Sequence, residues 1–254
     1  MARTDSDQFQ LDIDLDHAKR EAERMRDMLS ALRRRHDLSR YEYTTIVRIV
    51  PGGETFAHPV LTLGNRFACN EDLLLSTYLH EQMHWYLWYL GTPERDMLAP
   101  FMDELVRRYP DAPIDIANGG ARGYDATYEH LVVNWLEIAA TSEFIGRERA
   151  LAVAHAQRLR SYGWLYRKVV RDWDALGELY ERHDIVPIRT AQELRKLNAK
   201  AQAKVGARTG ANGHAKSGKR PLNGAARRTR AAALPPASPR SRRRSQARGG
   251  TTAG

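Results

Sequence analysis

Residues 79–85 read L-H-E-Q-M-H-W and contain the pattern H-E-x-x-H. In a helix, residues four apart lie one above the other on the same face, so the imidazoles of His80 and His84 can reach one metal ion. Glu81 is turned by about 100° around the helix axis, where its carboxylate can hold a metal-bound water and accept its proton. The stretch therefore predicts a zinc site on a helix, with His80 and His84 as ligands and Glu81 as the general base.

The sequence on either side of this motif supports a helix. Asn70 can cap its N-terminus, and Glu71 and Asp72 place negative charge in the first turn, where the helix dipole favours it. Gly91 and Pro93 are typical of a helix end. The alternative interpretation is that the two histidines lie on an apolar helix face, are each satisfied by a neighbour and bind nothing.

The residues around the motif resemble those of the zincin metallopeptidases. In that group a Thr or Val stands three residues before the first histidine, and the positions around and between the ligands are uncharged. Thr77 occupies the first of these positions here, and the others hold Tyr78, Gln82, Met83, Trp85 and Tyr86. The resemblance implies a helix-rich α+β domain with a short sheet, a bound Zn²⁺ and hydrolysis of a peptide or protein substrate.

A second helix is expected over residues 126–145, and it is apolar over most of its circumference. A narrow polar stripe interrupts it, made of His130, Asn134, Glu137 and Thr141. A buried carboxylate or imidazole is costly unless it is paired or bound to a metal. The stripe is therefore the expected source of a third ligand, although it could also be a polar network that satisfies itself within the core.

Two residues of this stripe compete for the role of third ligand. Zincins that take a ligand from a distant second helix most often use Glu, which favours Glu137, whereas other branches use His, which favours His130. The two are seven residues apart, about 10 Å along a helix axis, so both are not expected to bind the same ion. Whichever does not bind the metal is expected to orient a ligand or to contact substrate.

The spacing departs from the best-known pattern of the group. Glu137 lies much farther from His84 than the equivalent Glu does in thermolysin-like enzymes, so the chain resembles uncharacterised bacterial H-E-x-x-H proteins more than a named zincin family. Three further residues near the expected site are candidate substrate contacts: Tyr128, Asn134 and Tyr166. We expect Tyr162 and Trp164 to pack in the core, with donation from a tyrosine to an oxyanion as the alternative.

The remaining elements follow from periodicity and from turn residues. Strands are predicted at 41–50 and 55–63, and Pro59, which cannot donate to a ladder, places the second of them at a sheet edge or bulge. The resemblance suggests that an extended substrate binds along that edge. Residues 111–124 form a loop rich in Gly, Pro and Asp. Helices are predicted at 14–35, 95–109, 147–160, 164–182 and about 190–204.

Charge divides the chain into two parts. Residues from Lys196 onward hold fifteen of the 40 Lys and Arg and none of the 31 Asp and Glu, so residues 1–195 carry 25 basic and 31 acidic residues. We expect a metal-binding domain at 1–205 and a disordered basic tail at 206–254, because the tail consists mainly of Gly, Ala, Arg, Pro and Ser. The tail could bind nucleic acid or acidic surfaces without sequence preference, or could simply keep the protein soluble.

Composition limits the remaining possibilities. The single cysteine, Cys69, excludes an internal disulfide and a zinc site built from several thiolates. The polar N-terminus predicts no signal peptide, and the longest apolar run is too short for a membrane span, so we expect a cytoplasmic protein without membrane association. Zinc-dependent hydrolysis is the leading function. The alternatives are a metal-binding scaffold without turnover and a nucleic-acid-associated protein that acts through its tail.

Overall fold

The computed structural model describes residues 10–13, 19–64, 70–91 and 98–200. Its strands are β1 (Gln10–Ile13), β2 (Ile46–Val50) and β3 (Leu61–Gly64). Its named helices are α1 (Lys19–Arg35), the 3₁₀ helix η2 (Leu38–Tyr41), α2 (Glu71–Gly91), α3 (Ala99–Arg108), α4 (Tyr124–Ile145), α5 (Arg147–Arg158), α6 (Gly163–Arg171) and α7 (Trp173–Arg182). The prediction of a helix-rich α+β fold with a short sheet is therefore confirmed.

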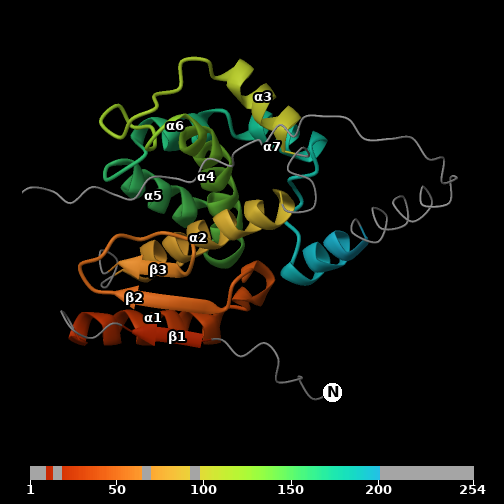
Figure 1. Cartoon of the computed structure of the whole chain (residues 1–254). Helices are drawn as coiled ribbons and strands as arrows, with labels where there is room; N and C mark the ends of the chain where they lie inside the picture. The colour runs from red at the N-terminus through yellow and green to blue at the C-terminus, as the bar shows by residue number, and fades with distance from the viewer. Residues whose placement is uncertain (1–9, 14–18, 65–69, 92–97, 201–254) are drawn as a thin grey trace, which may run out of the picture. The chain divides into compact units, whose positions relative to one another are not determined.

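The sheet has three parallel strands in the order β1-β2-β3. The helix α1 makes the crossover from β1 to β2, as parallel neighbours require. On β2, Val47 and Ile49 are buried while Ile46 and Arg48 are exposed, because successive side chains point to opposite faces. The helices α1 and α2 contact the sheet and also pack against each other, so they cover the same face (Figure 1).

Helices α2 and α4 form the centre of the described structure and pack along each other (Figure 1). Both are buried over most of their surface, as the sequence predicts for the helix at 126–145. The expected cap of α2 is confirmed, because the Leu73 backbone N–H donates to Asn70 Oδ1 at 2.9 Å, and the helix ends at Gly91. None of the described helices has the length and the apolar character needed to cross a membrane.

The strand predictions were too long at their N-terminal ends. The strand predicted at 41–50 begins only at Ile46. The 3₁₀ helix η2 extends to Tyr41 and precedes it. The second strand begins at Leu61, because residues 58–60 form a bend that turns the chain first. Strand β1, which the sequence analysis did not predict, completes the sheet.

Strand β3 lies at the edge of the sheet, as Pro59 indicates, but its outer side is already occupied. Phe56 and Thr62 exchange two backbone hydrogen bonds, of 3.0 and 2.8 Å, and the Gly64 N–H donates to Thr55 Oγ1 at 2.9 Å. An extended substrate would have to displace residues 55–56 to pair there. The prediction of an edge strand is therefore confirmed, while binding of an extended substrate there stays a prediction.

The helix predictions were mostly confirmed, with one division. The helix predicted at 164–182 is broken into α6 and α7 at Asp172, whose backbone leaves the helical region and whose carboxylate accepts from Tyr109 Oη at 3.0 Å. Residues 111–123 are irregular and residues 191–200 are helical, as predicted. The predictions for Cys69, for the starts of the helices at 14–35 and 95–109, and for the tail at 206–254 lie outside the described residues.

Gln82 stands between the two histidines of the motif but has a structural role. Its side chain is fully buried, and its Oε1 accepts from the backbone N–H groups of Tyr43 and Thr44 at 2.8 and 3.1 Å. Its Nε2 donates to Thr44 O at 2.9 Å and to Tyr78 Oη at 3.0 Å. Gln82 thus ties α2 to the segment that leads into β2 and fixes the rotation of α2 about its axis.

Gln82→Leu is expected to lower the free energy of unfolding by about 2–4 kcal/mol, because it leaves two backbone N–H groups and one carbonyl buried without partners. Urea denaturation followed by circular dichroism measures the loss. Gln192→Leu is the matched control, since Gln192 is exposed, and should change the stability by less than about 0.5 kcal/mol. Equal stabilities for the two variants would contradict this role.

Candidate metal centre

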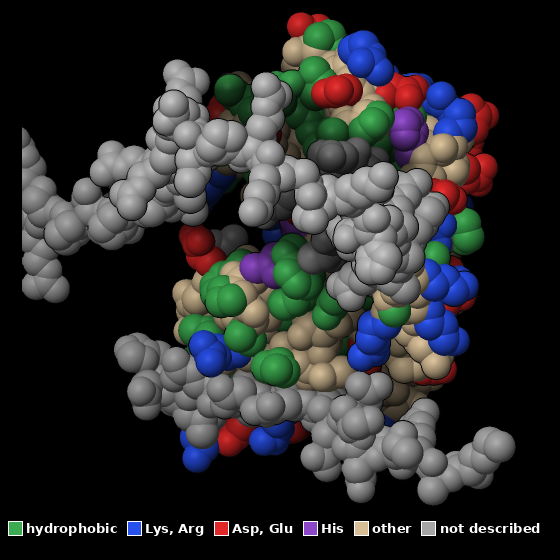
Figure 2. All heavy atoms as spheres, turned by 45° about the vertical axis from the view of Figure 1, so that its right-hand side comes forward, with side chains coloured by type: hydrophobic (Ala, Val, Ile, Leu, Met, Phe, Trp, Pro, Cys, Tyr) green, Lys and Arg blue, Asp and Glu red, His purple; other side chains and the backbone are tan. Residues whose placement is uncertain are grey.

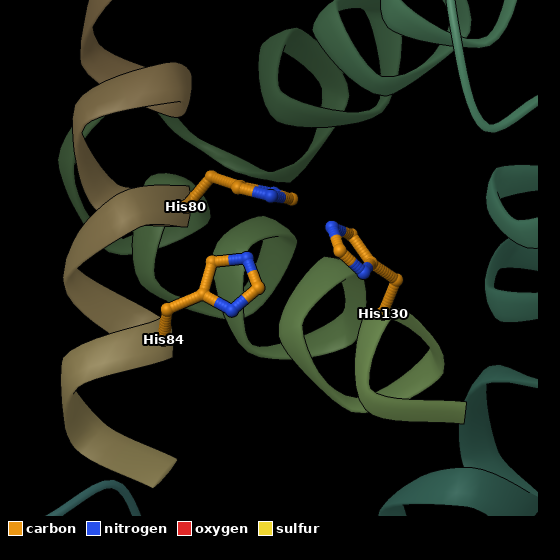
Figure 3. Close-up of side chains that lie close together, drawn as sticks. All are labelled: His80, His84 and His130. Atoms are coloured by element: carbon orange, nitrogen blue, oxygen red, sulfur yellow. The ribbon is translucent and has the colours of Figure 1, made fainter. Parts of the chain in front are cut away.

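Three histidines meet between the two central helices. His80 and His84 project from α2 and His130 projects from α4, and the three rings point into the space between these helices (Figure 3). One ligand nitrogen from each ring lies within 4.8 Å of the other two. The ring centroids are 5.0 Å apart for His80 and His84, 5.4 Å for His80 and His130, and 4.9 Å for His84 and His130.

Each of the three rings is held through its Nδ1 atom by a different oxygen. His80 Nδ1 donates to Glu137 Oε2 at 2.9 Å, and His84 Nδ1 donates to Glu129 Oε1 at 2.8 Å. His130 Nδ1 donates to the backbone carbonyl of Ala126, one turn earlier on α4, at 2.7 Å. A carbonyl only accepts, so the proton of neutral His130 is on Nδ1. These bonds leave the Nε2 lone pair of each ring available for a ligand.

The donor set fits a transition metal. Three neutral imidazoles with their Nδ1 atoms hydrogen-bonded to oxygen are a common arrangement of protein zinc ligands, and three protein ligands leave a fourth position for water. Nitrogens that bind one tetrahedral zinc at about 2.0–2.1 Å are about 3.3 Å apart. The three ring nitrogens lie within 4.8 Å of one another, which is close to that spacing. The described residues can therefore hold one metal ion with three histidines.

Glu137 lies behind the cluster and has no exposed surface. Its carboxylate accepts from His80 Nδ1, from Tyr166 Oη at 2.8 Å and from Ser76 Oγ. Burial opposes a charge on His80, but the hydrogen bond to Glu137 and the negative charges of Glu137, Glu81 and Glu129 together outweigh it and raise the pKa of His80. Three donors thus stabilise a buried carboxylate that would otherwise be costly, and they fix the orientation of the His80 ring.

His130 has the opposite electrostatic environment. Burial, together with the nearby His84 and His80, lowers the pKa of His130 well below its usual value. The ring is therefore neutral near pH 7, the form in which an imidazole binds a metal. His130 lies on α4 across from both histidines of α2, so its ring nitrogen joins theirs in the cluster.

Glu81 follows His80 on α2 and lies beside the cluster. Among the described residues, its carboxylate makes no hydrogen bond and no ion pair, although its side chain is largely enclosed. Burial raises the pKa of Glu81, while the nearby His80 and His84 oppose this shift. A carboxylate whose pKa is raised towards neutrality is better suited to accept a proton from water.

Tyr162 forms one wall of the site. Its ring centroid lies 4.4 Å from that of His130, and its ring is parallel to that of His80 at 6.2 Å. Its backbone is left-handed, with a φ of 56°, where the chain turns from α5 into α6. Burial, reinforced by the charge of Glu81, raises the pKa of Tyr162 to about 12, so its hydroxyl stays protonated.

The three candidate substrate contacts, Tyr128, Asn134 and Tyr166, lie in three different surroundings. Tyr166 is buried and donates to Glu137, so it supports the site from behind. Tyr128 donates to Tyr109 O at 2.7 Å and lies on the side of α4 opposite to His130. Asn134 lies one turn beyond His130, fully buried, and neither its Nδ2 nor its Oδ1 has a hydrogen-bond partner among the described residues.

Sequence reasoning missed two residues of the site and assigned a third to the core. Glu129 was left out because it lies outside the polar stripe, yet it adjoins His130 in the chain and reaches His84. Ser76, one turn before His80, was not considered. Tyr162 was expected to pack in the core. Its position between two predicted helices was the one sequence feature that favoured a place at the site.

The approach to the site is aromatic. The rings of His58 and Trp85 lie 4.3 Å apart, and Trp85 Nε1 donates to Ala57 O at 3.0 Å, which holds this segment on the C-terminal half of α2. On the face drawn in Figure 2, histidine atoms lie among hydrophobic side chains at the edge of a hollow.

Comparison with known proteins adds no relative. No protein-family model matches the chain, and no curated protein and no solved structure matches it significantly. The functional argument therefore rests on the geometry of this site.

Proposed function

We propose that this protein is a zinc-dependent hydrolase of the zincin type, and that its substrates are peptides or proteins. The observation that carries the proposal is the combination of three converging histidines, each oriented through Nδ1, with a buried carboxylate, Glu81, that has no partner among the described residues. His80, His84 and His130 are the proposed ligands. Glu137 takes the alternative role considered for it, that of orienting His80.

The proposed chemistry follows from the positions of these groups. A bound zinc ion would lower the pKa of a water molecule and polarise the scissile carbonyl. Glu81 would accept a proton from the attacking water and would pass it to the leaving amine. The ring of Tyr162 packs against that of His130, and its hydroxyl, protonated at neutral pH, would donate to the oxygen that becomes negatively charged.

A metal-binding scaffold without turnover is the second candidate. The same three histidines would serve it equally well, and a structural zinc site needs no free position. Glu81 favours the enzyme, because a carboxylate beside the three histidines can accept a proton from water, a function that a scaffold does not need.

Removal and return of the metal test the proposal. We expect purified protein to contain about one equivalent of zinc by elemental analysis and to hydrolyse members of a library of internally quenched peptides. Dialysis against a chelator should abolish hydrolysis, and one equivalent of zinc should restore it. Protein without bound metal would contradict the site, whereas zinc-loaded protein that cleaves neither peptides nor itself would leave the scaffold as the function.

A further inference from the structure

The helical hairpin α5–α6 carries a charge opposite to that of the domain around it. Residues 150–171 contain five Lys and Arg and no Asp or Glu, although residues 1–195 as a whole carry more acidic than basic residues. Charges usually mix on a protein surface because like charges repel. A run of one sign on two packed helices is therefore a candidate site for an anion.

A cavity of about 500 Å³ lies between these two helices. The helices α5 and α6 pack side by side (Figure 1). The polar lining of the cavity is entirely cationic or aromatic and includes His155, Arg158, Trp164, Arg167, Lys168 and Arg171, while its apolar lining consists of small and aliphatic side chains with the ring of Tyr166. Its volume falls within the range of about 300–1,000 Å³ that small-molecule sites occupy.

Most of the cations that line the cavity form no ion pair with an acidic residue of the described part of the chain. Arg171 pairs with Asp172 at 2.6 Å and is neutralised. Lys168 Nζ lies 5.2 Å from the ring centroid of Trp164 and 5.8 Å from that of Tyr109. These cation–π contacts hold the side chain of Lys168 but do not neutralise its charge. Within the described part of the chain, Arg158 and Arg167 form no ion pair.

We propose that this cavity binds a small phosphorylated molecule that carries at least two phosphate charges. Two guanidinium groups and one ammonium around a single space match the charge of such an anion, and the planar fork of Arg suits two phosphate oxygens at once. Arg167 is exposed, so the ligand can enter from solvent. This site is separate from the three histidines.

The cavity also adjoins the support of the metal centre. Tyr166 lines the cavity with its ring, and its hydroxyl donates to Glu137, which holds His80. A ligand in the cavity therefore lies against the side chain that orients a metal ligand. Binding there would act on the metal centre through Tyr166 and not through direct contact.

Calorimetric titration of the full chain with sodium tripolyphosphate at 0.15 M salt tests the proposal. The wild type should show one saturable site in addition to any weak binding by the basic C-terminal residues. Arg158→Ala/Arg167→Ala should weaken that site at least tenfold, because each charge-assisted hydrogen bond contributes substantially. The control Arg20→Ala/Arg107→Ala removes the same charge from exposed positions elsewhere and should change the affinity less than twofold.

Arginine modification by phenylglyoxal, read by mass spectrometry, tests the same site without any variant. Tripolyphosphate should protect Arg158 and Arg167 in the wild-type protein but not Arg20 or Arg107. Protection confined to arginines after Lys196, or equal binding by the two double variants, would overturn the proposal. Citrate that competes as tightly as tripolyphosphate would overturn the assignment to phosphate.

Discussion

Glu81→Gln is expected to retain its zinc and to hydrolyse peptides about 10²–10⁴-fold more slowly than the wild type. The substitution preserves the shape and the polarity of the side chain but removes its ability to accept a proton. Glu81 lies beside the histidines that we propose as ligands, and it makes no hydrogen bond or ion pair with the described residues, so the change should leave the fold intact. Steady-state hydrolysis and zinc content measured on the same preparation give both quantities.

Two outcomes would contradict the role of Glu81. Loss of the metal from Glu81→Gln would make Glu81 a ligand, and an unchanged rate would place the chemistry elsewhere. Glu148→Gln is a matched control, because Glu148 is an exposed carboxylate in the first turn of α5. Its zinc content and its rate should equal those of the wild type.

The local parts of the site could be read from the sequence because they depend on residues close together in the chain. Two histidines four apart on a helix share a face in any fold, and Asn70 caps that helix through a bond to a residue three positions away. The polar stripe of α4 was likewise visible, since a helix that is otherwise apolar has to be buried.

The choice between His130 and Glu137 could not be read in the same way. Both lie on the stripe, and the outcome depends on how α2 and α4 are placed along each other. In the structure, His130 faces the His80–His84 pair, whereas Glu137 lies about two turns farther along α4 and accepts a hydrogen bond from His80 Nδ1. If α4 were shifted by two turns along α2, Glu137 would face the pair and His130 would not. No local sequence pattern predicts how two helices are placed along each other.

Contacts that depend on irregular backbone could not be predicted from the sequence either. Tyr162 reaches the histidines because its backbone is left-handed, a conformation that residues other than Gly seldom adopt and that no neighbouring residue signals. Strand β1 has four residues and depends on β2 for its hydrogen bonds. Its sequence alone is too short to predict a strand.

His130→Ala is expected to lose most of its bound zinc, whereas Glu137→Gln should bind zinc about 10–100-fold more weakly than the wild type but still bind it. His130 supplies one of three proposed ligand nitrogens, and two histidines on one helix hold zinc poorly without a third ligand. Glu137 holds the Nδ1 proton of His80, and an amide oxygen can still accept from that proton, although without a charge.

Elemental analysis and competition with a chromogenic chelator distinguish these two effects. His36→Ala provides the control, because His36 packs against Phe144 and is not part of the histidine cluster, and this variant should retain one equivalent of zinc. The reverse order, with zinc lost from Glu137→Gln and kept by His130→Ala, would make Glu137 the ligand. In that case α4 would have to slide along α2 on metal binding, because the Glu137 carboxylate now lies at the Nδ1 atom of His80.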